Sequence, residues 1–189
     1  MEAIIKRDLI SDKKICRLLA VGTFVILTVL SAFVRIPLPF TPVPVTLQTF
    51  FVLLSGALLG RKLGVFAQAG YLFLGFFGQQ VFTGSGSGSL YLLGSTGGYI
   101  AGFILASFFA GSLLSNEKQS SAIIFAKLLT ADFIILLSGT FWLKISLSCT
   151  LVQAFLLGFI PFILADVFKV VLATVVYNKM HVRIKAVLF

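Results

Sequence analysis

The chain has 189 residues, of which 59% are hydrophobic and only 11% are charged, and its mean hydropathy is +1.10. Soluble domains carry about 25% charged residues, so the composition excludes a soluble globular domain and indicates an integral membrane protein. The formal net charge of +9 does not indicate nucleic-acid binding, because the basic residues lie at the ends of apolar segments, where Lys and Arg set orientation and attract anionic headgroups.

The apolar segments are predicted to be membrane-spanning helices. Stretches such as AGFILASFFAGSLL (101–114) lack the polar–apolar alternation of a membrane β-barrel, and a helix needs about 20 apolar residues to span. Six spans are predicted, at about 15–34, 45–59, 63–77, 95–114, 122–141 and 161–177. The polar start has no cleavable signal pattern, so the first span is expected to stay in the mature protein. The expected fold is an all-α integral membrane bundle of six transmembrane helices, forming a single domain over residues 1–189.

Proline and glycine mark two places where helices are not expected. Four of the five prolines fall in RIPLPFTPVPVTLQTF (35–50), and proline lacks a backbone donor and restricts its predecessor, so this segment is predicted to be an extended loop. The apolar stretch 141–179 is too long for one span. Gly158 and Pro161 are predicted to divide it into a short lateral helix and the last span.

The distribution of basic residues predicts the orientation. By the positive-inside rule, the end rich in Lys and Arg faces the cytoplasm, which places both termini there. The proline loop, the segment GQQVFTGSGSGSLYLLGS (78–95) and the turn before Pro161 then face outward as Gly/Pro-rich lid loops. The basic residues on the cytoplasmic side are Lys6, Arg7, Lys13, Lys14, Arg17, Arg61, Lys62, Lys118, Lys127, Lys179, Arg183 and Lys185, with Arg35 and Lys144 opposite.

Two opposite charges lie inside the last predicted span, in FILADVFKVVL (162–172). Asp166 and Lys169 are three residues apart, so they share one face of a helix, at the depth where the three outward loops converge. A charge at a helix centre costs roughly 2.5–3.5 kcal/mol on insertion scales, so such residues normally face a cavity or a partner. The pair is therefore interpreted as the polar wall of an outward-facing ligand pocket; the alternative is an ion pair that fills space between helices.

Other polar or glycine-rich segments near the outward-facing side each have two possible interpretations. The run TGSGSGS (83–89) is either a flexible linker or a lid that exposes backbone N–H groups. GSTGGY (94–99) is either a helix start capped by Ser95 or Thr96 or a site of tight helix packing. Gln48 is either an interfacial residue or a ligand contact. Arg35 either binds an anionic group or extends toward headgroups.

The sequence gives little support for catalysis. Its single histidine, His181, lies beyond the last span, and neither Cys16 nor Cys149 belongs to a pattern typical of a disulfide framework, a metal site or a nucleophile. Asp132, in the middle of the fifth span, is a second intramembrane acid without an obvious partner. An intramembrane enzyme using Asp132 and Asp166 is an alternative, as is a scaffold, but the protein is expected not to be an enzyme and to hold no metal.

Five segments together resemble the BioY family, the biotin-binding membrane subunits (S components) of energy-coupling factor (ECF) transporters. The matching segments, in order across most of the chain, are IPLPFTPVPVTLQTF (36–50), LLSGALLGRKLG (53–64), YLFLGFFG with VF two residues later (71–82), LGSTGGYIAGF (93–103) and IPFILADVFKVVLA (160–173). The family often has small residues four apart on its first helix for docking a membrane partner. Here Ala20 is followed by Phe24 in that spacing.

The resemblance implies biotin as the transported ligand, with no cofactor. Asp166 is then expected to accept a ureido N–H and Lys169 to donate to the ureido carbonyl, with a further amide contact from Gln48. The remaining expected biotin contacts are Tyr99 and Phe82 as walls for the ring, and Arg35, Gly84 and Ser85 near the tail carboxylate.

The resemblance also implies how the protein works and where it lies. It is expected to capture biotin from outside and to mediate its uptake with a transmembrane coupling subunit and paired cytoplasmic ATPases, as a multi-pass protein of the plasma (inner) membrane. Membrane lipid and possible further copies of the chain complete the expected partners, and nucleic acid is excluded. The alternative is an S component of the same architecture that binds another small vitamin, since relatives share the fold with different pockets.

Overall fold

The structure, a computed structural model, describes residues 13–114 and 119–189. The predictions for the polar start, with Lys6 and Arg7, and for Lys118 lie outside the described residues. The described elements are α2 (Lys13–Phe33), β1 (Arg35–Ile36), β2 (Val45–Thr46), α3 (Gln48–Phe76), α4 (Gly88–Leu93), α5 (Gly97–Leu113), α6 (Ser121–Ser146), α7 (Leu151–Gly158), the 3-10 turn η1 (Ile160–Phe162) and α8 (Ile163–Leu188).

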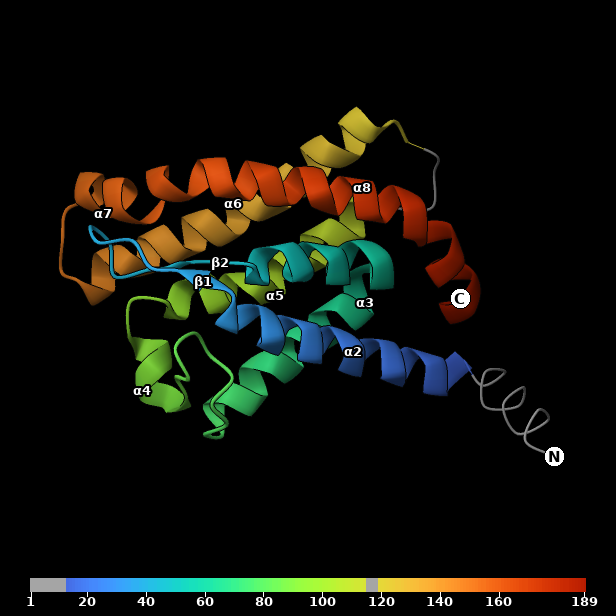
Figure 1. Cartoon of the computed structure of the whole chain (residues 1–189), viewed down its shortest axis with the longest axis horizontal. Helices are drawn as coiled ribbons and strands as arrows, with labels where there is room; N and C mark the ends of the chain where they lie inside the picture. Colours follow the sequence, from blue (N-terminus) through green and yellow to red (C-terminus); the bar gives the residue numbers. More distant parts are fainter. Residues whose placement is uncertain (1–12, 115–118) are drawn as a thin grey trace.

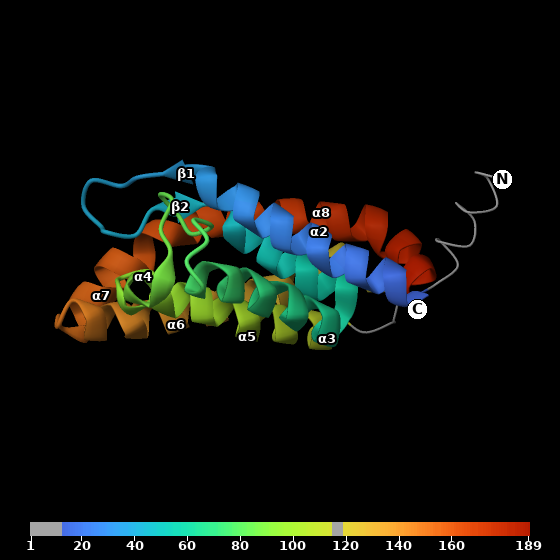
Figure 2. The same cartoon turned by 90° about the horizontal axis from the view of Figure 1, so that it is seen from below.

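The long helices run roughly alongside one another as a bundle (Figures 1 and 2). Three of them, α2, α3 and α6, are long and apolar enough to cross a membrane, as is the range Leu151–Leu188, which comprises α7, η1 and α8. Helix α5 is a shorter apolar helix of 17 residues. The prediction of an all-α, multi-pass membrane fold is confirmed. Its physical basis is that a helix satisfies all of its backbone hydrogen bonds within one segment, which lipid requires.

Helix α3 contains both the second and the third predicted spans, because it folds back at Gly60. This glycine has φ 77°, a left-handed conformation that is costly for other residues. The two halves pack against each other: Gln68 Nε2 donates to Ser55 Oγ at 2.9 Å, and Gly64 lies directly against the backbone of Gly56. With the halves counted separately, α2, α3, α5, α6 and α8 supply six long helical segments.

The end of the bundle that carries most basic residues also holds the first and last described residues. Lys13 donates to the Phe189 carbonyl, and Arg17 Nε donates to the Leu188 carbonyl at 2.8 Å. The Phe189 ring lies beside Gly60, so the fold-back of α3 is at the same end. The start of α2, the α3 fold-back and the end of α8 therefore form one face of the bundle.

The opposite end is built from short, irregular segments. Strands β1 and β2 pair antiparallel, Arg35 with Thr46 and Ile36 with Val45, so the proline-rich segment is non-helical as predicted and also forms a small hairpin. It lies at the same end as α4 and α7 (Figure 1). Helix α7 ends at Gly158 and Pro161 lies in η1, which confirms the predicted break.

Helix α8 continues well past its predicted end at Tyr177, to Leu188. The sequence beyond Pro161 contains neither glycine nor proline, the residues that most strongly end helices. Lys, Arg and Met are good helix formers, so the polar residues after Tyr177 extend the helix beyond the apolar span.

Candidate ligand-binding site

The two charged residues of the last span lie together at the irregular end of the bundle. Asp166 occupies the first turn of α8, where the positive end of the helix dipole favours a carboxylate, and Lys169 follows one turn later. The two side chains form an ion pair, and the residues are only 2% and 6% exposed, respectively. The predicted juxtaposition on one helix face is therefore present, and both charges are removed from the surface.

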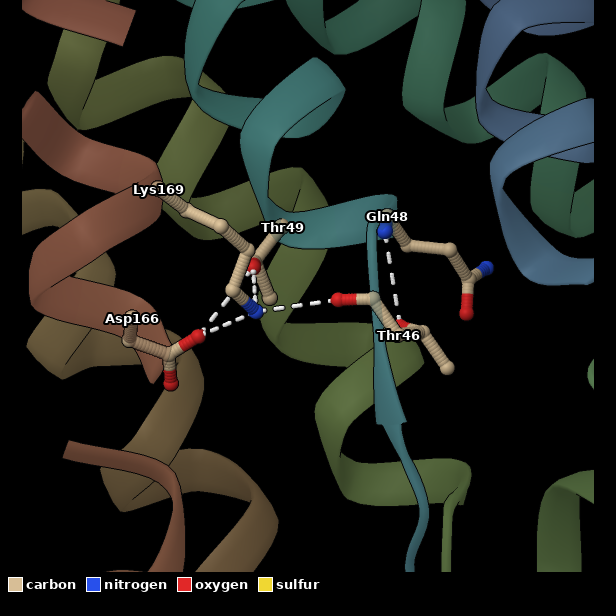
Figure 3. A network of polar contacts seen from close by, with 5 residues as sticks. All are labelled: Thr46, Gln48, Thr49, Asp166 and Lys169. Atoms are coloured by element: carbon tan, nitrogen blue, oxygen red, sulfur yellow. Dashed lines mark hydrogen bonds and ion pairs between the residues drawn. The ribbon is translucent and has the colours of Figure 1, made fainter. Parts of the chain in front are cut away.

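Threonines from a distant segment complete the surroundings of this pair (Figure 3). Lys169 Nζ donates to Thr49 Oγ1 at 2.7 Å and to the carbonyl of Thr46 at 2.9 Å. The Thr49 hydroxyl in turn donates to Asp166 Oδ1 at 3.3 Å. The ammonium has three N–H donors, and Asp166, Thr49 and Thr46 occupy all three.

The carboxylate of Asp166 is only half satisfied. Its hydrogen bond from Thr49 and its ion pair with Lys169 both use Oδ1, and among the described residues Oδ2 has no hydrogen-bond partner. In Figure 3, Oδ2 points away from the network of Thr49, Thr46 and Lys169. An ionised carboxylate has about four acceptor positions, so Asp166 retains capacity for N–H donors from a ligand.

A small pocket, open on one side, lies against this pair. It has a volume of about 50 Å³ and is lined by polar groups from β2, α3 and α8 and by apolar and aromatic groups from α5 and α6. Such a space holds a few water molecules, so a larger ligand can enter only if lining side chains move. Its wall includes Gln48, Thr49, Thr83, Tyr91, Thr96, Tyr99, Ile135, Leu136, Asp166 and Lys169.

A wider vestibule adjoins the cavity on the side of the loops. Its volume is about 330 Å³, and it shares Pro44, Thr83, Tyr91 and Thr96 with the inner cavity. Arg35 is the charged residue in the lining of the vestibule, which also includes Gly94 and Ser95. The two adjoining, partly open spaces are called the inner chamber, with Asp166 and Lys169, and the outer chamber, with Arg35.

A chain of hydrogen bonds connects α3 to the glycine-rich loop. Gln48 Nε2 donates to the Tyr71 hydroxyl at 2.6 Å, and Thr83 Oγ1 donates to Gln48 Oε1 at 3.1 Å. The Tyr91 hydroxyl then donates to the Thr83 carbonyl at 3.0 Å. Gln48 is therefore buried at the cavity wall, and both ends of its amide are held in place by these neighbours.

The glycine–serine run forms a tight turn in the structure. Phe82 N donates to the Gly86 carbonyl at 3.0 Å, and Gly84 and Ser85 between them have φ values of 75° and 61°. A Cβ at Gly84 would lie 2.6 Å from the Arg35 guanidinium, so the turn packs on that side chain. Gly84 and Ser85 lie beside the vestibule through this contact but are not among the residues that line either chamber.

The two aromatic residues proposed as walls have different positions. Tyr99 lines the inner cavity, and its hydroxyl donates to the Gly158 carbonyl at 2.6 Å, at the end of α7. Phe82 is fully buried between Tyr71 and Tyr91, with its ring stacked 5.0 Å from the Tyr91 ring. Tyr91 thus lines both chambers in front of Phe82.

The segment GSTGGY begins α5 without a side-chain cap from Thr96 and packs closely against α6. Thr96 is at the N-cap position of α5 but its side chain makes no capping hydrogen bond, so this part of the capping prediction is wrong. A Cβ at Gly98 would lie 2.1 Å from Trp142 Cβ, which is the close helix packing that small residues permit. Ser95 and Thr96 line the chambers.

Known proteins match this chain over most of its length. A model of the BioY family matches residues 6–186. The chain is 41% identical over 160 residues to the biotin transporter BioY of Thermotoga maritima, covering 85% of this chain and 92% of that protein. It is 38% identical over 161 residues to a probable biotin transporter BioY of Pyrococcus horikoshii, covering 85% and 93%, respectively.

A solved structure has the same fold. The crystal structure of the S-component for biotin from an ECF-type ABC transporter superposes with a TM-score of 0.85 and 25% sequence identity, and the match covers 89% of this chain and 92% of that one. The likeness thus extends over most of both chains.

Proposed function

The chain belongs to the BioY family, and from this we propose that it is a biotin-uptake subunit, the substrate-binding S component of an ECF-type transporter. It is a transport protein rather than an enzyme, and biotin is its cargo rather than a cofactor. The relatives described above are named for biotin, and the two chambers at the irregular end of the bundle supply groups that fit this ligand.

The observation that carries the proposal is the half-satisfied Asp166 at the wall of the inner chamber. The ureido head of biotin has two N–H donors and one carbonyl, and Asp166 Oδ2 is an acceptor without a partner among the described residues. Hydrogen bonds to an ionised group are roughly twice as strong as neutral ones. Lys169 donates to the ureido carbonyl once the ligand displaces one of its present acceptors.

The rest of the ligand fits the division into two chambers. With the ureido head in the inner chamber, the apolar ring contacts Tyr99 and Tyr91, and the tail reaches the vestibule. There Arg35 meets the tail carboxylate, with the Gly84–Ser85 turn resting on its guanidinium. Since the inner chamber is small, the turn at Thr83 and its neighbours must shift to admit the ring, which is the role of a lid.

A lateral cleft near the opposite end suits a membrane partner. It has a volume of about 610 Å³, lies between α2, α3 and α8, and is almost wholly apolar, with Ala20 and Phe24 on its wall and Arg183 at its edge. We propose that a helix of the transmembrane coupling subunit binds there, above paired cytoplasmic ATPases. In this proposal the end of the bundle that is rich in Lys and Arg faces the cytoplasm, so both termini are on that side of the plasma membrane and the ligand chambers are outside.

Binding of biotin to the detergent-purified chain tests the proposal. Labelled biotin should bind saturably, and unlabelled biotin should compete while other water-soluble vitamins do not. An Asp166→Asn variant should bind more weakly, since it replaces an acceptor-only group by an amide. If labelled biotin does not bind but another labelled vitamin binds saturably, the architecture serves another ligand; if the folded chain binds none of them, the proposed function is wrong.

A further inference from the structure

A buried tyrosine outside both chambers holds one of the polar groups in their wall. Tyr71 lies in the second half of α3, is fully buried and lines neither chamber. Its hydroxyl accepts a hydrogen bond from Gln48 Nε2 at 2.6 Å and donates to the Val81 carbonyl at 3.3 Å. Gln48 does line the inner chamber, so the route from the Tyr71 hydroxyl to the ligand site runs through Gln48.

These two hydrogen bonds fix which end of the Gln48 amide faces which neighbour. A tyrosine hydroxyl has one proton and a backbone carbonyl can only accept, so the Tyr71 proton goes to Val81. The Tyr71 oxygen must then accept, and only the NH2 end of the amide can donate to it. A reversed amide would place its oxygen beside Tyr71, and the single proton could then serve Gln48 or Val81 but not both. Gln48 Oε1 therefore faces Thr83, which donates to it at 3.1 Å.

The oxygen of this amide lies on the chamber side. Thr83, its donor, lines both chambers, whereas Tyr71 lines neither. In Figure 3 the Lys169 ammonium lies between the Asp166 carboxylate on one side and the Gln48 amide on the other. The wall of the inner chamber thus presents an acceptor, a cation and a second acceptor in that order. A cyclic ureido group has the matching order, because its carbonyl lies between two N–H groups that point to opposite sides of the ring.

The segment that carries Val81 is anchored independently of the turn that follows it. The Phe82 ring is fully buried, and its centroid lies 5.5 Å from that of the Tyr71 ring. It fills the space beside Gly75, where a Cβ would lie 2.0 Å from Phe82 Cζ. The turn after Phe82 can therefore shift to admit a ligand, as proposed above, while Tyr71 keeps its acceptor. The Gln48 oxygen then loses its hydroxyl donor from the turn but keeps its orientation.

We propose that Tyr71 is a positioning residue that fixes Gln48 as a hydrogen-bond acceptor for the second N–H of a ureido ligand. This inference rests on the proposed function, because it assigns a role within that binding site. With Asp166 Oδ2 as the first acceptor, both donors of the ligand head find an oxygen and its carbonyl meets Lys169. A ligand that lacks the second N–H would leave Gln48 Oε1 buried without a donor, which is unfavourable. Tyr71 thereby contributes to specificity without contacting the ligand.

A double-mutant cycle separates this role from a general packing role. Tyr71→Phe removes the hydroxyl and keeps the ring, so the full chain in detergent should bind biotin about three- to tenfold more weakly. In a Gln48→Leu background the same substitution should change Kd by less than about twofold, because no amide is left to orient. Tyr99→Phe is the matched control: its hydroxyl donates to the Gly158 carbonyl, so its effect should be equal in both backgrounds. An equal effect of Tyr71→Phe in both backgrounds would overturn the proposal.

Ureido analogues decide the case in which Tyr71→Phe does not fold. Biotin methylated on one or the other ureido nitrogen should bind the parent about tenfold more weakly than biotin, or worse. Gln48→Leu should relieve this loss for one of the two analogues only, since an apolar side chain accepts a methyl group where the amide needed an N–H. Equal binding of biotin and both analogues, or relief of neither or both, would overturn the proposal. If the parent binds no biotin, the proposed function fails and this role with it; if biotin binds and the cycle is additive, only the role of Tyr71 fails.

Discussion

Replacement of Lys169 by Met is the most direct test of the charged pair. Met keeps a long side chain but removes the ammonium, and with it the ion pair to Asp166 and the hydrogen bonds to Thr49 and Thr46. Asp166 is then left buried without a counter-ion. Removing one partner of a buried pair typically costs about 3–5 kcal/mol, so the ligand-free variant should unfold at clearly lower temperature than the parent.

The same substitution should reduce biotin binding by a predictable amount. A hydrogen bond to a charged group contributes about 1.5–3 kcal/mol, which corresponds to roughly a 10- to 150-fold increase in Kd. Isothermal titration calorimetry with biotin on the purified variant measures this directly. A folded Lys169→Met protein that binds biotin as tightly as the parent would refute the assignment of Lys169 to the ligand site.

Two further variants separate charge from packing. In Asp166→Asn with Lys169→Met, no unpaired charge remains, so part of the lost stability should return while biotin binding stays weak. Lys144→Met removes a cation from an exposed position on α6 that lines neither chamber, and should leave Kd unchanged. If Lys144→Met weakened binding as much as Lys169→Met, the effect would be one of net charge rather than of the site.

Three other substitutions test separate parts of the site. Arg35→Gln should weaken binding of biotin about tenfold but leave binding of biotinamide, which lacks the tail carboxylate, nearly unchanged; equal effects in a competition assay would contradict the vestibule assignment. Thr49→Val removes the hydroxyl that links Lys169 to Asp166, so calorimetry should show a several-fold higher Kd for biotin. An unchanged Kd would mean that Thr49 does not contribute to biotin binding. Gly98→Ala should destabilise by about 1–3 kcal/mol, because its Cβ would overlap Trp142, and thermal unfolding should show no such loss for Gly22→Ala, which has open space around it.

The helices and the charged pair could be predicted from local sequence. Spans follow from runs of apolar residues of the length that a bilayer requires, and the break before α8 follows from Gly158 and Pro161. Asp166 and Lys169 could be placed together because both lie on one helix, where a spacing of three residues fixes a shared face. The fold-back of α3 at Gly60 coincides with the gap between the predicted spans 45–59 and 63–77, where Arg61 and Lys62 interrupt the apolar sequence.

The partners of that pair could not be predicted in the same way. Thr49 and Thr46 precede Lys169 by more than a hundred residues, and no periodicity connects them. The stacking of Phe82 behind Tyr91 depends on the turn of the glycine–serine run and on α4, a helix of six residues, which is too short to give a periodic signal. Packing decides these contacts, so they appear only once the fold is known.

The hydrogen bonds of Asp166 bear on why the pair is charged at all. An ion pair that only filled space between helices gains little over apolar residues of similar volume, and it would be expected to satisfy both carboxylate oxygens within the protein. Here Oδ1 makes both the hydrogen bond with Thr49 and the ion pair with Lys169, and Oδ2 has no hydrogen-bond partner among the described residues. Asp166 also lines the inner chamber, which continues into the vestibule containing Arg35. Lys169, by contrast, is fully engaged. The pair therefore holds its cation in place and leaves an acceptor for a donor from outside, which a ureido group supplies.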